Sequence, residues 1–229
     1  MRTMLPALLF TAVVWAVPVR AAPTPVVTSA PAALQALGWQ MLTFEGIPPT
    51  RFRRQADGAI VVEARSSSAV LFRRLAETDR GHTLTWRWMV RQGLPPTPQD
   101  RKGADDRALA VHVWFGPRLG TSGLFKTLAG ALGFDVPGRV LTYAWGGQGV
   151  QGEVLVNPHY ADEGRIIVLR GGRPPERVWL AERVDLKADY RRAFGDEAPA
   201  PSHIAVSGDA DDLDAVSLGL VRGLTLRPD

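Results

Sequence analysis

The chain has 229 residues, 45% of them hydrophobic, and a formal charge of +4, which suits one β-rich domain with a sizeable core and excludes global disorder. Of its 27 basic residues, 24 are arginines scattered along the sequence among acids, so no basic stripe for a nucleic acid is expected. Cysteine is absent, which excludes disulfides, thiolate metal sites and a cysteine nucleophile.

The first 21 residues have the layout of a secretory signal peptide. Arg2 supplies the positive n-region, Leu5–Val17 is almost wholly apolar, and Val19-Arg20-Ala21 forms a cleavage site. The apolar run is short for a membrane span of about 20 residues. We therefore predict a periplasmic or secreted protein that does not span the membrane after cleavage. The sequence leaves its oligomeric state open.

Residues 22–37 are rich in Pro and Ala and are predicted to form a linker, followed by a single domain over residues 38–229. In Thr83–Arg91 apolar and polar residues alternate, which is typical of a strand with one face in the core. Ala108–Phe115 is apolar on both faces, as a covered central strand would be. Further strands are expected at Ile60–Ala64, Ala69–Arg73, Val140–Trp145, Arg165–Arg170, Val178–Val184, His203–Ser207 and Val216–Leu226.

Two short helices are expected between these strands. Ser122–Leu132 has leucines at helical spacing, and Asp185–Phe194 begins with a capping Asp and is followed by Gly195. The many short strands, with no alternation of strand and helix, predict an all-β fold with minor helices. We expect an antiparallel β-sandwich of jelly-roll type.

Several short motifs occur together in a fixed order along the chain. They are FEGIPPTRFR at Phe44–Arg53, WRW at Trp86–Trp88, RKGADD at Arg101–Asp106, YAW at Tyr143–Trp145, NP at Asn157–Pro158, DLKADYRRAFG at Asp185–Gly195 and DAD at Asp209–Asp211. The set resembles the bacterial domain of unknown function 3047 family over about residues 38 to 227. The resemblance implies an exported β-sandwich and no established activity. The chain departs from the family pattern at Ala110, where the family has Arg, and at Asp212-Leu213, where it has Asn-Thr.

Four aspartates crowd the loop from Asp209 to Asp214. An EF-hand is excluded, because Leu213 stands where the fifth position needs an oxygen ligand. Asp209 and Asp211 remain candidate ligands of a structural calcium, and no other cofactor is expected. The alternative is a solvated turn, in which each Asp bonds its own backbone.

Asp105 and Asp106 form a second acidic pair before a central strand. With Asp209 or Asp211, either could supply the acid and base of a glycan-cleaving enzyme. Adjacent acids usually point in different directions, so both are not expected in one site. A capped surface loop is the alternative.

Arg87 and several aromatic residues are the candidates for ligand binding. Aromatic rings on a sheet face stack on sugar rings when the face is open, and pack in the core when it is not. The candidate ligand-binding residues are Arg87, His112, Trp114, Tyr143 and Trp145.

These features favour an exported, non-catalytic binding module for a carbohydrate or a similar polar envelope ligand. Two alternatives stay open: the glycan-cleaving enzyme, and a structural envelope protein without a ligand.

Overall fold

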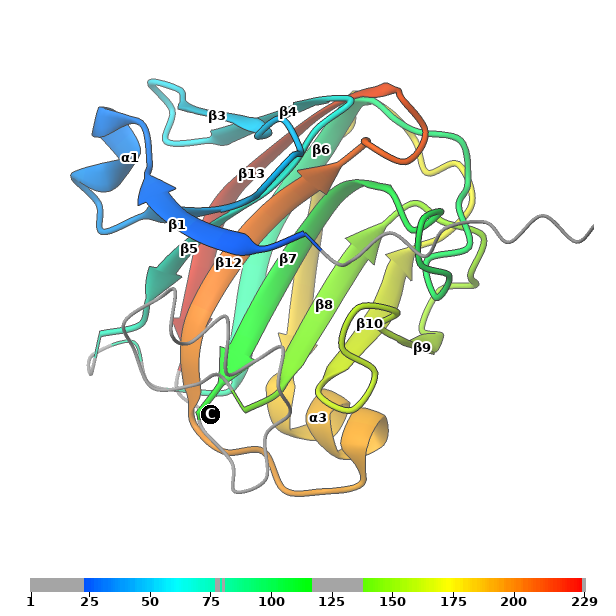
Figure 1. Ribbon diagram of the computed structural model, residues 1–229. Helices are drawn as coiled ribbons and strands as arrows, with labels where there is room; N and C mark the ends of the chain where they lie inside the picture. The colour runs from blue at the N-terminus through cyan, green and yellow to red at the C-terminus, as the bar shows by residue number, and fades with distance from the viewer. Residues whose placement is uncertain (1–22, 77–78, 80, 117–137, 228–229) are drawn as a thin grey trace, which may run out of the picture.

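The computed structural model describes residues 23–76, 79, 81–116 and 138–227, whose strands form two facing sheets (Figure 1). Strands account for 49% of the described residues and helices for 7%, which confirms a mostly β, sandwich-like fold with minor helices. The predicted signal peptide, residues 1–21, and the predicted helix at Ser122–Leu132 lie outside the described residues.

The larger sheet has eight strands in the order β1-β2-β5-β12-β7-β8-β10-β9. Its strands are β1 (Pro25–Ser29), β2 (Gln40–Phe44), β5 (Ser68–Arg74), β7 (Arg107–Phe115), β8 (Val140–Trp145), β9 (Val154–Val156), β10 (Gly164–Arg170) and β12 (Pro201–Asp209). Neighbours are antiparallel except β8 and β10, which run parallel. The sheet therefore departs from a purely antiparallel arrangement at this one pair, where β9 turns the chain back before β10.

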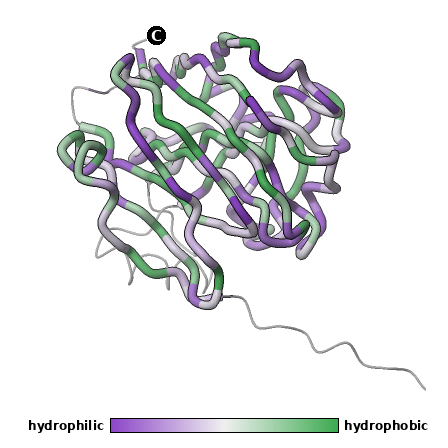
Figure 2. The backbone as a smooth tube through the Cα atoms, turned by 90° about the horizontal axis from the view of Figure 1, so that it is seen from above, coloured by the Kyte–Doolittle hydropathy of each residue, from purple (hydrophilic) through white to green (hydrophobic). Residues whose placement is uncertain are grey.

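The smaller sheet has five strands in the order β11-β6-β13-β4-β3, all antiparallel. Its strands are β3 (Arg51–Arg54), β4 (Ile60–Arg65), β6 (Thr83–Gln92), β11 (Leu180–Asp185) and β13 (Val216–Arg227). In Figure 2 hydrophilic and hydrophobic segments alternate along the strands. This alternation gives the smaller sheet an inner apolar face and an outer face that is largely polar, except for a small apolar cluster that includes Val61, Met89 and Leu220.

The main core lies between the two sheets and is rich in aromatic rings. Trp86 and Trp88 on β6 are buried, as predicted from the alternation, and face Tyr143 and Trp145 on β8 with centroids 5.6 and 5.3 Å apart. The indole nitrogen of Trp88 donates to Glu182 at 2.8 Å. A ring of this size can be buried when its polar atom finds a partner.

The helix α3 (Leu186–Phe194) confirms the predicted caps. Asp185 accepts the backbone N–H groups of Lys187 and Ala188, and Gly195 ends the helix in the left-handed conformation at φ 73°. No described helix is long and apolar enough to cross a bilayer.

The N-terminal segment corrects one prediction. Residues 22–37, expected as a linker, contain β1 and the short helix α1 (Ala32–Gln35). β1 pairs with β2 from Pro25↔Phe44 to Ser29↔Gln40, so an edge of the sheet accepts these residues despite their Pro- and Ala-rich composition. Long-range pairing has overridden local composition.

Candidate cation and ligand site

Three carboxyl groups from separate places in the sequence meet at one end of the eight-stranded sheet. Asp106 precedes β7, Asp209 ends β12, and Asp211 lies in the loop to β13; one oxygen of each lies within 4.8 Å of the others. We call these three residues the carboxylate cluster. The sequence-based candidates Asp106, Asp209 and Asp211 are thus brought together, whereas Asp105 points elsewhere.

The pairing of β7 with β12 explains why the cluster forms. Their register shifts between Ser207 and Asp209, which lie opposite Ala110 and Arg107, so an irregularity places Asp209 beside the start of β7. The carboxylate of Asp106 then accepts the backbone N–H groups of Asp212 at 3.3 Å and Leu213 at 2.7 Å. These two bonds hold the aspartate loop against β7.

The cluster is costly to ionise, because the nearby Arg107 charge offsets only part of the effect of burial and of the neighbouring carboxylates. Burial, together with the nearby Asp212 and Asp211 charges, raises the pKa of Asp106 to about 6. Burial and a hydrogen bond with Asp211 raise the pKa of Asp209 well above its usual range. The Oδ1 atom of Asp209 is buried and has no hydrogen-bond partner. An oxygen in that position is a free ligand for a hard cation such as Ca²⁺.

Beside the cluster lies the buried ion pair of Asp105 and Arg107, and His159 connects this pair to the solvent. Arg107 Nη2 donates to Asp105 Oδ2 at 2.7 Å, and the two side chains are only 6% and 2% exposed. His159 Nε2 lies 3.1 Å from both oxygens of Asp105 and is 36% exposed. Burial would raise the pKa of Asp105, but the His159 hydrogen bond and the Arg107 charge hold it below its usual range.

A polar chain crosses the outer face of the same sheet. His112 Nε2 lies 2.8 Å from Ser207 Oγ, and His112 Nδ1 lies 3.0 Å from Thr142 Oγ1. Burial, with the charge of Arg107, lowers the pKa of His112 to about 3. His112 is therefore a neutral, fully partnered side chain that ties β7 to β8 and β12.

The five residues expected to bind a ligand do not converge on one surface. Tyr143 and Trp145 face the core between the sheets, and Trp114 stacks on Phe72 on the other face of the larger sheet, with centroids 5.2 Å apart. Arg87 is exposed on the outer face of the smaller sheet. Tyr143 and Trp145 share the inner face of the larger sheet, His112 and Trp114 share its outer face, and Arg87 lies apart from both pairs.

Sequence reasoning did not single out Arg107 and His159. Arg107 directly follows the quoted RKGADD motif and begins an apolar strand. A basic residue in that position signals a buried charge that needs an acidic partner. His159 follows the NP motif, and Asn157 accepts its backbone N–H at 2.9 Å. The Asn turn predicts a fixed loop, but only the folded chain shows that it faces Asp105.

A separate cleft of about 310 Å³ lies between α1, the β3–β4 hairpin and β13. Leu34, Trp39 and Ile60 line its apolar base, and Arg54 and Arg73 line it as well. None of the sequence-based candidates lines it, so it is distinct from the carboxylate cluster.

A comparison with models of protein families shows which family this chain belongs to. The model described as "Protein of unknown function (DUF3047)" matches residues 37–222. The chain belongs to the DUF3047 family. This confirms the family resemblance drawn from the ordered motifs. Among the curated proteins, no match was found.

Proposed function

We propose that this DUF3047 chain is an exported, non-catalytic binding module for a carbohydrate or similar polar ligand, with a structural Ca²⁺ at the carboxylate cluster. The observation that carries the proposal is the meeting of Asp106, Asp209 and Asp211, each with one carboxylate oxygen within 4.8 Å of the others, together with the buried, unpartnered Oδ1 of Asp209. Ca²⁺ prefers several oxygen ligands of this kind in a flexible geometry. The ion would relieve the repulsion and fix the β12–β13 loop.

The neighbouring side chains support a polar ligand. The His159 imidazole is exposed, and Asp211 and Asp212 stay accessible beside it. Imidazole and carboxylate groups are suited to bonding hydroxyl groups of a sugar. A non-catalytic role is favoured because Asp105 is held by Arg107 and Asp106 by two backbone N–H groups.

Calorimetry with CaCl₂ and glycan-array binding, each with and without a chelator, test the proposal. Ca²⁺ should bind the wild type, and the chelator should remove glycan binding. Asp209→Asn should weaken Ca²⁺ binding at least tenfold, whereas Asp162→Asn, at an exposed acid on the β9–β10 loop, should not. Ca²⁺ binding with no glycan bound in either condition would leave only the structural envelope protein.

One observation favours the glycan-cleaving alternative. Burial raises the pKa of Asp106 to about 6, and such a carboxyl group beside Asp209 or Asp211 can hold a proton for a leaving group. Asp106 and Asp209 have carboxylate oxygens within 4.8 Å of each other, which is nearer to the separation of about 5 Å used by retaining enzymes than to the wider separation of inverting ones. Hydrolysis of envelope polysaccharides, lost in Asp209→Asn, would establish it; an uncut panel contradicts it.

The proposal also includes export of the chain through a cleaved signal peptide. The n-h-c pattern of residues 1–21 supports a cleaved signal peptide, and the mature chain is expected to begin near Ala22 in the periplasm or medium. N-terminal sequencing of the native protein checks this, and an intact Met1 would contradict it.

A jelly-roll connection of the strands stays a prediction, supported by the two facing sheets.

A further inference from the structure

The outer face of the five-stranded sheet collects arginines that are scattered in the sequence. In β3, Arg51 and Arg53 flank the buried Phe52; in β6, Arg87 lies between the buried Trp86 and Trp88. Strand alternation therefore turns these arginines outward. The exposed arginines without an ion pair on this face are Arg51, Arg53, Arg87, Arg91 and Arg183, which we call the arginine face.

Two acidic side chains near this face already form ion pairs with other arginines. Glu63 pairs with Arg65 at 2.7 Å and Asp57 with Arg222 at 3.2 Å. Within the described ranges, none of the five members of the arginine face has an ion-pair partner. The face therefore carries an excess of positive charge, although the whole chain has a formal charge of only +4.

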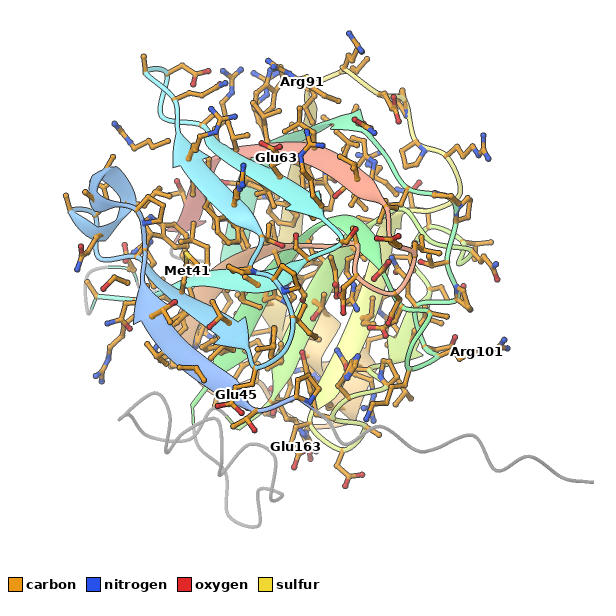
Figure 3. The ribbon with its side chains drawn as sticks, turned by 45° about the horizontal axis from the view of Figure 1, so that its top comes forward. Met41, Glu45, Glu63, Arg91, Arg101 and Glu163 are labelled. Carbon is orange, nitrogen blue, oxygen red and sulfur yellow. The ribbon has the colours of Figure 1, made fainter. Side chains whose placement is uncertain are left out.

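The register brings two like charges together on this surface, because Arg87 on β6 lies directly opposite Arg222 on β13. On β3, by contrast, Arg51 lies opposite Glu63. Figure 3 shows Arg91 and Glu63 on the same side of the molecule, with Arg101 at a separate edge. Like charges directly opposite destabilise a sheet, so bound anions would be stabilising here.

We propose that the arginine face binds an acidic polysaccharide, one that carries carboxylate or sulfate groups. Guanidinium forks bind such groups through two parallel hydrogen bonds. Arg51 and Arg53 lie two residues, about 7 Å, apart on β3, and β6 with its arginines lies three strand spacings of about 4.8 Å away, beyond β4 and β13. An extended chain of acidic sugars is long enough to reach both groups. The proposal extends the proposed function to a second surface and does not depend on the cation.

A polysaccharide fits this face better than a membrane. Binding in a bilayer interface needs exposed apolar side chains that insert beside the basic ones. The exposed large hydrophobic residues of the described chain lie on none of the five strands; they are Val26, Leu37, Val150, Val156, Val178 and Leu213. Trp179, beside this sheet, is covered by the Arg222 guanidinium 4.1 Å from its ring centroid.

The test measures binding of immobilised polygalacturonate, heparin and neutral dextran to the mature chain in the presence of a chelator. Polygalacturonate or heparin should bind, and dextran should not. Binding should weaken by roughly tenfold or more between 50 and 200 mM salt, because several counterions are released. The chelator separates this result from the cation-dependent binding proposed above.

Two variants with the same change of charge locate the surface. Arg51→Glu with Arg53→Glu should weaken polygalacturonate binding at least tenfold. Arg101→Glu with Lys102→Glu exchanges two positive charges for two negative ones away from the face. This control should change polygalacturonate binding less than twofold. Arg87→Gln with Arg183→Gln gives a milder loss on the same face if the first variant does not fold.

Three results would overturn the proposal. The first is no binding of either acidic polysaccharide at 50 mM salt. The second is binding of phosphatidylglycerol vesicles or duplex DNA while the polysaccharides do not bind. The third is an equal loss in the Arg101→Glu, Lys102→Glu control, which would show an effect of net charge alone.

Discussion

The acidic end of the larger sheet and the arginine face of the smaller sheet contain two closely matched ion pairs. Asp105–Arg107 and Glu63–Arg65 each join residues two apart, and each N–O distance is 2.7 Å. Their surroundings differ: the first pair is 2% and 6% exposed, the second 19% and 62%. Distance alone therefore does not tell what a charge contributes, because burial decides whether it needs a fixed partner.

The largest expected effect breaks the buried pair. Asp105→Asn should lower the free energy of unfolding by about 3–5 kcal/mol, because Arg107 is left charged and buried. Glu63→Gln, the matched change in the exposed pair, should cost about 0–1 kcal/mol. Denaturant unfolding of both variants measures the difference. Adding Arg107→Met to Asp105→Asn should recover much of the loss; two equal single-variant costs would contradict the comparison.

Calcium should sharpen the contrast between the two regions. At 100 times its Kd, a bound ion adds about 2.7 kcal/mol to the free energy of unfolding, a rise in Tm of about 5–10 °C for a chain of this size. The rise should vanish in Asp209→Asn and persist in Arg51→Glu with Arg53→Glu. Scanning calorimetry with CaCl₂ and with a chelator measures it. An equal rise in Asp209→Asn would place the ion elsewhere.

The buried histidine predicts a pH dependence. The folded pKa of His112 is about 3, below its unfolded value, so the unfolded chain binds the proton more readily. His112 therefore contributes stability above about pH 6.5 that is lost progressively as the pH falls toward 3. Between pH 7 and 5 this loss is about 2 kcal/mol. Urea unfolding at a series of pH values should show that the free energy of unfolding falls more steeply between pH 7 and 5 in the wild type than in His112→Gln. Parallel curves of this free energy against pH would show that His112 is not buried and neutral.

The smallest effect concerns the arginine face. Arg87→Gln should raise the free energy of unfolding by about 0.2–1 kcal/mol at low salt, because Arg87 lies opposite Arg222. Salt should remove the gain. Arg183→Gln is the control, since Arg183 lies opposite Thr85. Equal changes in the two variants would show that the opposed charges are not the cause.

Much of the fold could be predicted from local patterns. Alternation defined β6, and an apolar run defined β7, because burial on one face or both leaves a direct trace in sequence. The caps of α3 were predicted from Asp185 and Gly195. β1 was missed, because its residues form a strand only through pairing with β2.

The site was less predictable, because it depends on which loops meet. The aspartates were recognised, but the grouping of Asp106 with Asp209 depends on the irregular pairing of β7 and β12, which places Asp209 beside the start of β7. Tyr143 and Trp145 illustrate the opposite problem. A sheet-face aromatic has the same sequence pattern whether the face is open or covered, and here a second sheet covers it. The arginine face was hidden for a related reason, since its members come from three strands.

The position of β13 has a consequence for the order of folding. It is the last strand of the described chain, yet it lies at the centre of the smaller sheet and joins β4 to β6. β12, the strand before it, joins β5 to β7 in the larger sheet. Neither sheet is complete until these late strands have left the ribosome, and such long-range pairing folds slowly. The central pairings of both sheets therefore form only after β12 and β13 have been synthesised.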